Sequence, residues 1–573
     1  MRGEGGIRTH DTVAGIPPFQ GGQFNRSCTS PDAKPSQNIR REGGNCNLNL
    51  SAWLVYSRIP PKDSRTPFMP SPTPSIARSA LWNHLGKMGD YVLMYVGSII
   101  LARALGIDAY GRYAALVSGI HVLLALSSFG LEAALTRHIA SFQGQGELER
   151  TRFLARRGLG MRFVLFLAAA IVGAAVAATR GWFGSPAETL LLVLVAGYGL
   201  TRALVLVAVT VLTARFRTGP AAIISVIGRL VEVTGFLIGA SYGLSIPMTF
   251  GIFLASGVLQ ILLHVTWCND VWFGEVTPVP LRPVMVFAGV FGINAIVDYF
   301  LGRQGDIALL ALIGGDPAAT SRYDVSYSLL QAGAMVATLG LSGVSLAALS
   351  RFPPGDEHAR RQLYAVLVRV NSFMTIPVLG FLFITAEDIL SLLYGGPFVS
   401  AAPVLRVLLL LRIIARIFAG GENADLMLSM DRVRPLVMIG LVAAAVTIAL
   451  HVLLIPLYAA EGAAVASGSG AMTANILGYA YVRRVLGSGL EWRSWLSLTG
   501  ATVAAGGVAW YLLPDAQGIP LIALKLTIFA VVWFLCAMAI RPVEQQDGEA
   551  LGRVLPFLRA PLGLLARSTG GIR

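Results

Sequence analysis

The stretch VRPLVMIGLVAAAVTIALHVLLI (433–455) is apolar at almost every position, and about fourteen comparable windows lie between Ala80 and Ile540. A helix needs roughly 20 apolar residues to cross the ~30 Å hydrocarbon core of a bilayer. The runs are continuous rather than alternating, which favours helices over a membrane β-barrel. The sequence therefore predicts an all-α, polytopic membrane protein with about 14 transmembrane helices.

The bulk composition excludes an ordinary soluble enzyme. Of the 573 residues, 55% are hydrophobic and only 13% are charged, and the mean hydropathy is +0.66. A net charge of +14 would indicate a nucleic-acid partner in a soluble protein. Here the arginines lie mainly in connectors, so we expect no nucleic-acid partner. The four cysteines have neither metal nor disulfide spacing, and no GxxxxGK[ST] nucleotide loop occurs. We expect no cofactor, no metal and no catalytic residue.

Positive charge sets the expected orientation. Arginines gather in alternate connectors, at Arg137, Arg150, Arg152, Arg156, Arg157 and Arg162, then Arg215 and Arg217, Arg351, Arg360 and Arg361, Arg432 and Arg434, and Arg483, Arg484 and Arg493. Cytoplasmic loops carry such an excess of arginine. Both termini are therefore predicted to be cytoplasmic.

The two ends of the chain differ from its centre. Residues 1–68 are rich in Gly, Pro, Ser, Asn and Arg, which is typical of a disordered tail. The alternative is a spuriously translated segment before a true start at Met69. The basic tail 541–573 is expected to be cytoplasmic, either as an amphipathic helix on the inner leaflet or as a solvated segment.

An internal repeat divides the apolar core. YGRYAALV and SSFGLEAALTR within 110–137 are similar to SRYDVSYSLL and TLGLSGVSLAALSR within 321–351, with Tyr113 opposite Tyr323 and Gly130 opposite Gly340. Six helices separate the copies, so both point the same way across the membrane. This predicts a parallel repeat, the alternative being chance similarity between apolar segments. Transport folds commonly place a substrate path between such halves.

Three segments carry a family resemblance. LARALGIDAYGRYA (101–114) resembles the first periplasmic turn of the polysaccharide biosynthesis, or oligosaccharide flippase, family. SYSLLQAGAMVATLGLSGVSLAALSR (326–351) and LLIPLYAAEGAAVAS (453–467) are similar to its eighth helix and its eleventh-to-twelfth turn. The family belongs to the superfamily of multidrug, oligosaccharidyl-lipid and polysaccharide exporters. The resemblance implies two six-helix lobes around a central cavity, at 69–275 and 276–484, and two additional helices at 485–540.

Charged residues inside apolar helices are candidates for function, because an ionisable group at bilayer depth is costly unless it faces a wet cavity or a partner. Asn294, Asp298 and Asp306 share one broad helix face. We expect Asn294 in the cavity, and Asp298 and Asp306 at an ion-coupling site. The alternative is an internal ion pair that locks the bundle, since Arg303 lies three residues before Asp306.

A second set is expected to bind the substrate. Arg412 and Arg416 lie four residues apart on one helix and need a common counter-ion, which a substrate pyrophosphate would supply. Arg202 follows Tyr198 by one turn and is expected to contribute from the first lobe. The alternative pairs these arginines with Asp298 or Glu422. The family has mostly apolar residues along this helix, so the pair at 412 and 416 carries no inherited role.

The remaining candidates lie in the first and fifth helices. Arg229 is expected in the cavity and Glu232 in ion coupling, although one turn separates them and self-pairing is the simpler interpretation. Lys87 and Asp90 are expected at a cytoplasmic gate, the alternative being snorkelling of Lys87 to the interface. His121 and His451 are single histidines in apolar helices, where one internal hydrogen bond is typical.

The predicted function is that of a flippase, with no covalent chemistry. We expect undecaprenyl-pyrophosphate-linked oligosaccharide to move from the inner to the outer leaflet of a bacterial cytoplasmic membrane, by alternating access, for surface polysaccharide synthesis. Expected partners are this lipid-linked oligosaccharide, membrane lipids, a polysaccharide polymerase and glycosyltransferases. A multidrug exporter or a peptidoglycan-precursor (lipid II) flippase is the alternative. A membrane polymerase or ligase is disfavoured, because every external connector is short.

Overall fold

The computed structural model describes residues 74–179, 184–338, 344–350, 352, 356–514, 518–540, 543–544 and 566–567. Side chains are described from residue 86 on, except at residues 290, 294, 338, 344 and 347 and at the strand residues. The expectations for the tails, a disordered or spurious segment at 1–68 and a basic helix within 541–573, lie outside the described residues. So do Gly340 and Arg351 of the repeat.

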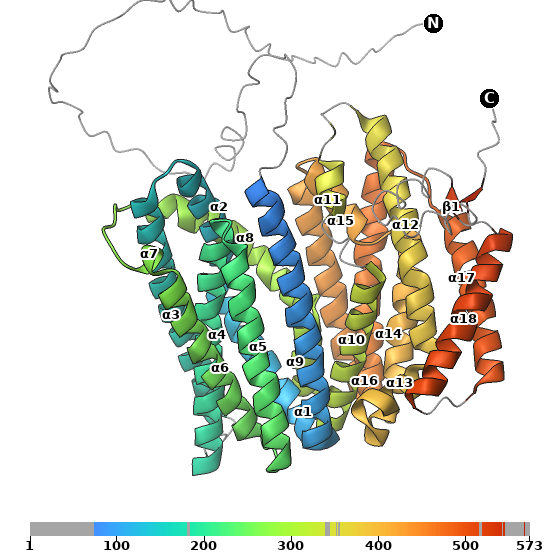
Figure 1. Cartoon of the computed structure of the whole chain (residues 1–573), viewed down its shortest axis with the longest axis horizontal. Helices are drawn as coiled ribbons and strands as arrows, with labels where there is room; N and C mark the ends of the chain where they lie inside the picture. The colour runs from blue at the N-terminus through green and yellow to red at the C-terminus, as the bar shows by residue number, and fades with distance from the viewer. Residues whose placement is uncertain are drawn as a thin grey trace, which may run out of the picture. The chain divides into compact units, whose positions relative to one another are not determined.

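The described part of Ser71–Arg573 is helical apart from two dipeptide strands (Figure 1). Its first half contains α1 (Pro74–Ser128), α2 (Leu131–Gly144), α3 (Leu148–Thr179), α4 (Pro186–Ala214), α5 (Thr218–Ser241), α6 (Ile246–Trp267), α7 (Asn269–Trp272), α8 (Leu281–Phe300), α9 (Arg303–Leu309) and a π-helical turn, η2 (Leu310–Gly314).

The second half contains α10 (Pro317–Thr338), α11 (Val344–Leu349), α12 (Glu357–Ile384), α13 (Ala386–Tyr394), η3 (Gly396–Ala401), α14 (Ala402–Ala415), η4 (Arg416–Phe418), α15 (Gly421–Ser429), α16 (Val433–Leu486), α17 (Trp492–Leu512) and α18 (Ile519–Ile540). The strands β1 (Val543–Glu544) and β2 (Ala566–Arg567) pair in parallel. The all-α prediction is confirmed.

Ten helices in the described ranges are long and apolar enough to cross a membrane. Two of them, α1 and α16, each contain a sharp break. The breaks lie at Gly106 (φ 76°) and Ala459 (φ 46°), inside the two segments that resemble family turns. Glycine adopts this left-handed backbone without steric cost, whereas Pro456 weakens α16 just before Ala459. The polytopic architecture is confirmed, and the total of fourteen spans stays a prediction.

The helix that carries Tyr198 and Arg202 begins at a strong local signal. Ser185 caps α4: its hydroxyl accepts a hydrogen bond from the Glu188 backbone N–H at 3.2 Å, and the Glu188 carboxylate accepts one from the Ser185 N–H at 3.1 Å. Pro186 then occupies the first helical position. This capping box fixes where the apolar run starts to wind.

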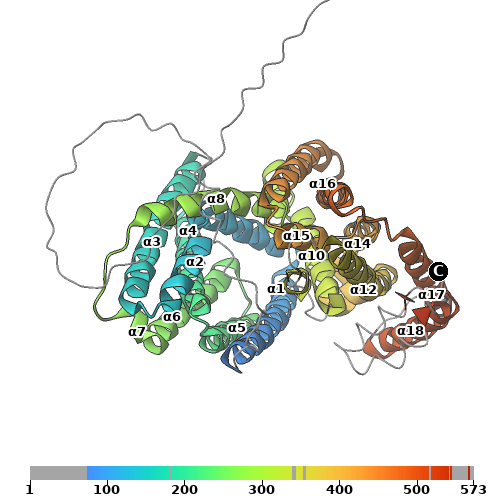
Figure 2. The ribbon, with the colours of Figure 1, turned by 90° about the horizontal axis from the view of Figure 1, so that it is seen from above.

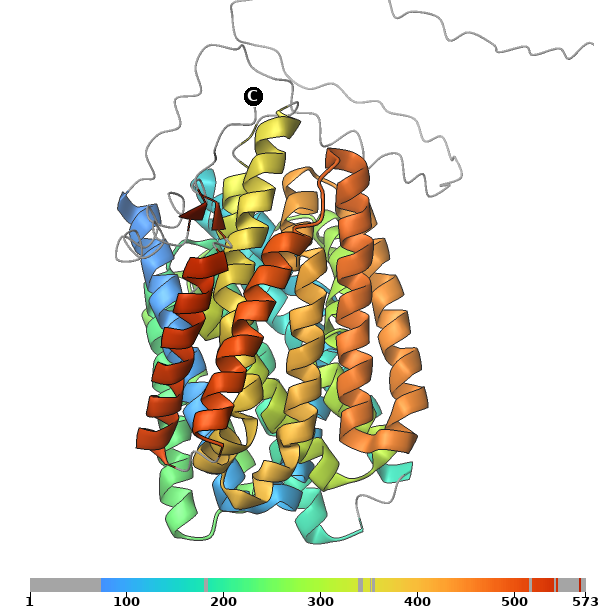
Figure 3. The same cartoon turned by 90° about the vertical axis from the view of Figure 1, so that its right-hand side faces the viewer.

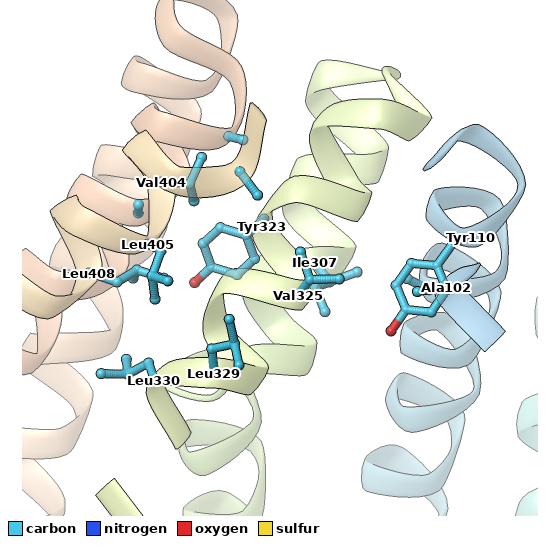
Figure 4. Close-up of a cluster of buried hydrophobic side chains, with 14 of the residues drawn as sticks. Ala102, Tyr110, Ile307, Tyr323, Val325, Leu329, Leu330, Val404, Leu405 and Leu408 are labelled. Atoms are coloured by element: carbon cyan, nitrogen blue, oxygen red, sulfur yellow. The ribbon is translucent and has the colours of Figure 1, made fainter. Parts of the chain in front are cut away.

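The helices surround a core near the centre of the bundle. Seen from above, α2–α7 lie on one side and α12, α14, α17 and α18 on the other, with α1, α10 and α15 between them (Figure 2). α1 packs along both α5 and α10. Figure 4 shows the buried cluster where α1, α9, α10 and α14 meet, with Tyr110, Ile307, Tyr323 and Leu405 among its members. α8 contacts both α2 and α16, so it bridges the two sides.

Two further features concern the ends of the bundle. α2, α7, α11 and α15 lie at one end in Figure 1, which is the end that holds the arginine-bearing connectors. The described connectors that adjoin α2 and α15 lie at this end, and the predicted orientation, with both termini cytoplasmic, stays a prediction. At the edge of the bundle, α17 and α18, the red helices of Figure 3, form a pair beside α12.

Candidate functional site

A cavity of about 220 Å³ lies between α1, α4, α5, α6, α9 and α10. It is bordered by helices from both predicted lobes, because α1, α4, α5 and α6 precede residue 276 and α9 and α10 follow it. The polar lining residues are Tyr95, Ser98, Tyr110, Tyr113, His121, Tyr198, Arg202, Arg229, Glu232, Arg303, Gln304, Asp324 and Ser328. Four of these, Tyr198, Arg202, Arg229 and Glu232, are residues that the sequence singled out.

Arg202 is a cation in this cavity without a counter-ion. Its side chain is half-buried on α4, and it has no hydrogen bond or ion pair to any described residue. Tyr198, one turn earlier, stacks on Phe253 with ring centroids 4.8 Å apart. A guanidinium within a membrane span is tolerated where it faces water or an anion. Arg202 is therefore placed to receive an anionic ligand.

Arg229 is held by two carboxylates. Its Nη1 lies 2.7 Å from Glu232 Oε2 on the same helix, and its Nε lies 3.0 Å from Asp90 Oδ1 on α1. Ser256 of α6 donates to the other Glu232 oxygen at 3.1 Å. Self-pairing of Arg229 and Glu232, the simpler of the two sequence interpretations, is thus present. Asp90 extends it into a link between α1 and α5, and Lys87 lies exposed one turn before Asp90.

Sequence reasoning missed a second ion pair of the cavity. Arg303 Nη2 of α9 lies 2.6 Å from Asp324 Oδ1 of α10, and Tyr110 of α1 donates to Asp324 Oδ2 at 2.9 Å. The sequence placed Arg303 beside Asp306 instead, on the basis of their spacing along one helix. The acidic residue within SRYDVSY, inside the repeat, was the available signal.

Asp306 points away from Arg303 and is completely buried. The Tyr323 hydroxyl donates to Asp306 Oδ2 at 2.5 Å, and His451 Nε2 of α16 lies 3.3 Å from Oδ1. His451 Nδ1 also lies 2.8 Å from its own Thr447 carbonyl oxygen, so it makes the expected internal bond. This cluster joins α9, α10 and α16 behind the cavity and does not line it. Asp298 lies exposed on α8, and the Asn294 side chain lies outside the described residues.

The arginines of α14 do not line the cavity either. α14 ends at Ala415, and the tight turn η4 directs Arg416 to Glu422 at the start of α15, with Nη1 3.1 Å from Oε2. Asn371 donates to the same carboxylate at 2.6 Å. Arg416 therefore pairs with Glu422, which was the alternative interpretation of the sequence. Arg412 lies exposed on α14, without a hydrogen bond or ion pair to the described residues.

The cavity also presents neutral polar atoms without partners. The Tyr95 hydroxyl and Gln304 Oε1 are buried and lack a hydrogen bond within the described part of the chain. His121 Nδ1 lies 2.8 Å from its own Val117 carbonyl oxygen, and its ring lines the cavity. A buried polar atom without a partner is costly, so these atoms favour a ligand rich in hydroxyl groups.

Among the described residues, no three His, Cys, Asp or Glu side chains come close enough together to hold a metal ion. Cys268 and Cys536 are free thiols. The cavity around Arg202 presents a guanidinium together with hydroxyl and amide groups.

The fold is similar to that of known transporters. A lipid II flippase MurJ in an inward closed conformation aligns with a TM-score of 0.65 and 14% identity, over 80% of this chain and 98% of that chain. A multidrug resistance MATE family transporter of the MOP superfamily aligns with a TM-score of 0.56 and 13% identity, over 70% and 94%. A MOP superfamily transporter from Pyrococcus furiosus, with a binding pocket of reverse polarity, gives 0.53 and 14%, over 72% and 95%.

Sequence comparison gives the family. No curated protein matches the chain. A family model described as polysaccharide biosynthesis protein matches residues 100–403, just over half of the chain. This range contains Tyr198, Arg202, Arg303 and Asp324, and it includes two of the three segments on which the resemblance rests. The chain is a multi-pass membrane protein that belongs to the polysaccharide biosynthesis protein family and has the fold of the MOP superfamily.

Proposed function

We propose that this protein is a flippase that moves undecaprenyl-pyrophosphate-linked oligosaccharide from the inner to the outer leaflet of a bacterial cytoplasmic membrane. The observation that carries the proposal is Arg202, a cation that has no counter-ion among the described residues and lines the cavity between α1, α4, α5, α6, α9 and α10. The fold similarity to transporters and the family membership support it.

The charges of the cavity favour an anionic ligand. Three arginines and two carboxylates, Glu232 and Asp324, line it. Arg303 pairs with Asp324, and Arg229 pairs with Glu232 and also with Asp90, which does not line the cavity. Arg202 is the remaining cation. A guanidinium fork matches two phosphate oxygens, so a pyrophosphate diester fits this position.

The sugar would form hydrogen bonds with the neutral polar atoms of the cavity. The Tyr95 hydroxyl and Gln304 Oε1 need partners that sugar hydroxyls provide as both donors and acceptors. The polyprenyl tail would stay in the bilayer. Arg412, Arg416 and Asn294 remain proposed as further contacts in another conformation of the transport cycle.

Alternating access requires that contacts between α1 and its neighbours break at the end of the bundle opposite the arginine-bearing connectors. Arg103 of α1 donates to the backbone carbonyls of Leu392 and Leu393 at the end of α13, and Tyr110 donates to Asp324. We assign ion coupling to Glu232, Asp298 and Asp306, and a gate at the opposite end to Lys87 and Asp90. An ion gradient or the membrane potential would drive the cycle, since the sequence contains no nucleotide loop.

Lipid II is the second candidate substrate. One solved protein with this fold is described as a lipid II flippase, and lipid II carries the same pyrophosphate chemistry. Arg202 favours either lipid-linked sugar over a cationic drug. A polysaccharide polymerase and glycosyltransferases would be the functional neighbours for the oligosaccharide substrate.

The test is a translocation assay with the full-length protein in sealed vesicles. We expect labelled undecaprenyl-pyrophosphate-linked oligosaccharide to cross, and the rate to fall at least tenfold in Arg202→Gln. Arg434→Gln is the matched control, since this exposed arginine lies outside the cavity. Lipid II and a cationic drug are run in parallel. Translocation of the drug alone, or an undiminished rate in Arg202→Gln, would refute the proposal.

A further inference from the structure

A second, separate cavity of about 100 Å³ lies at the arginine-rich end of the bundle. It is formed where α12 begins, α16 ends and the connector 487–491 leads into α17. Arg361 and Tyr364 line it from α12, Tyr479 from α16, and Ser488 and Glu491 from the connector. It shares no lining residue with the cavity around Arg202.

Two polar groups in this cavity lack partners. Ser488 is only 4% exposed, and its hydroxyl oxygen has no hydrogen bond within the described ranges. Arg361 has no hydrogen bond or ion pair to a described residue. Arg361 is exposed, and its guanidinium lies beside Gly487, the residue before Ser488: a Cβ atom placed on Gly487 would be 3.6 Å from Arg361 Nη1.

Arg361 and Glu491 are the charged residues among the described residues that line this cavity. Glu491 is the acidic lining residue, and Arg369 of α12 neutralises it, with Nη1 3.3 Å from Oε1. Tyr479 donates its hydroxyl proton to the Ser488 carbonyl oxygen at 3.2 Å and so fixes the connector. The charge that remains is that of Arg361.

The surroundings place the cavity at the level of lipid headgroups. Arg483 and Arg484 lie exposed in the last turn of α16. Trp492, the first residue of α17, is 48% exposed, and Arg493 stacks on its ring at 5.5 Å. Exposed tryptophan together with clustered arginine is typical of helix ends at the membrane–water interface. Basic pockets between helices at such ends bind the head groups of anionic lipids.

We propose that this cavity binds the phosphodiester headgroup of an anionic phospholipid from the leaflet at the arginine-rich end. Arg361 donates to the phosphate oxygens, and the Ser488 hydroxyl donates to the same group. Ala365, Val368 and Leu490 form an apolar wall beside them, next to which the start of an acyl chain packs. The lipid braces the connector between α16 and α17 and is not the transported substrate.

Native mass spectrometry of the full-length protein tests the proposal. The protein is released from nanodiscs that contain phosphatidylglycerol and phosphatidylcholine in equal amounts. We expect wild type to retain phosphatidylglycerol selectively, and retention to fall about tenfold in Arg361→Gln and less in Ser488→Ala. Arg434→Gln, an exposed arginine at the same end, is expected to behave as wild type. Equal retention by wild type and Arg361→Gln would overturn the proposal.

A thermal unfolding measurement in detergent distinguishes a lipid from a soluble phosphate. Phosphatidylglycerol is expected to raise the Tm of wild type but not that of Arg361→Gln, and glycerol phosphate at millimolar concentration is expected to have no effect. A rise with glycerol phosphate equal to that with phosphatidylglycerol would show a site for soluble phosphates and refute the lipid assignment. Because translocation is not read out, failure here leaves the proposed flippase function untouched.

Discussion

Arg303 and Asp324 form a buried ion pair, with Nη2 2.6 Å from Oδ1, and Tyr110 donates a hydrogen bond to the second oxygen of the same carboxylate. Asp324 thereby joins three helices, α1, α9 and α10, at the point where the two sides of the bundle meet. The pair also accounts for two of the charges that line the cavity around Arg202.

Removing one partner of this pair should destabilise the protein strongly. In Asp324→Asn the guanidinium of Arg303 stays buried without a counter-charge, which typically costs about 3–5 kcal/mol. We expect a large fall in Tm during thermal unfolding of the purified protein. The Tyr110→Phe variant loses one hydrogen bond and leaves the ion pair intact, so its Tm should fall much less. Equal losses in the two variants would contradict this account of Asp324.

The close approach of α1 and α10 depends on Gly111. A Cβ atom at this position would lie 1.8 Å from the Pro317 carbonyl oxygen, which is a backbone atom and cannot rotate away. We therefore expect Gly111→Ala to separate the two helices and to reduce the yield of folded protein, measured by fluorescence-detected gel filtration. Gly119→Ala, on the same helix, is the control, because a Cβ atom at Gly119 meets nothing within 4 Å. A normal elution profile for Gly111→Ala would disprove the close contact.

Lys525 links the C-terminal helix pair, α17 and α18, to α13. This side chain is completely buried on α18, and its Nζ lies 2.8 Å from Asp388 Oδ2 on α13. We expect Lys525→Met to lower the Tm, because the Asp388 carboxylate loses its cation. The double variant Lys525→Met with Asp388→Leu should recover most of the loss, since apolar residues of similar size can replace a buried pair. A double variant less stable than the single one would argue against this pairing.

Acidification should lower the stability of the protein by protonating Asp270 at the arginine-rich end. A hydrogen bond from Arg215 holds the pKa of the Asp270 carboxyl below its usual value, and the charges of Arg215 and Arg217 act in the same direction. Because the pKa is lower in the folded state, this contribution to stability is present above the pKa of the unfolded chain. It is lost as the pH falls through the folded pKa.

The measurement is the Tm as a function of pH, from neutral pH to below the ordinary aspartate pKa of about 3.9. We expect Asp270→Asn to be less stable than wild type at neutral pH and to lose less stability on acidification. Parallel curves for the two proteins would exclude a role of Asp270 in acid sensitivity.

The sequence predicts well what depends on local composition. Apolar windows give the helical membrane fold, and the family turns mark the breaks at Gly106 and Ala459. A charge within a span predicts a wet or paired position, which holds for Arg202 and Arg229. These features need only the spacing along one helix and the high energy of a charge in lipid.

Partners across helices were harder to predict. Two carboxylates are candidates to pair with Arg303. The three-residue spacing along one helix favours Asp306, whereas the packing of α9 on α10 brings Asp324 to Arg303. Arg416 turns to Glu422 because the chain breaks at Ala419, where φ is +62°. Hydropathy alone does not place such a break, although Gly420 and Gly421 directly after Ala419 are a local signal of one. These choices depend on tertiary packing that one sequence does not encode in its spacing.

The break in α1 limits how this end of the molecule can move. A single residue, Gly106, separates its two arms, and Ser98 on the first arm lies within hydrogen-bonding distance of Tyr110 on the second, at 2.9 Å. This contact joins the two arms near the break. Release of Tyr110 from Asp324 would therefore swing both arms together as one stiff hairpin, and the pivot would lie far from Gly106, toward the arginine-rich end.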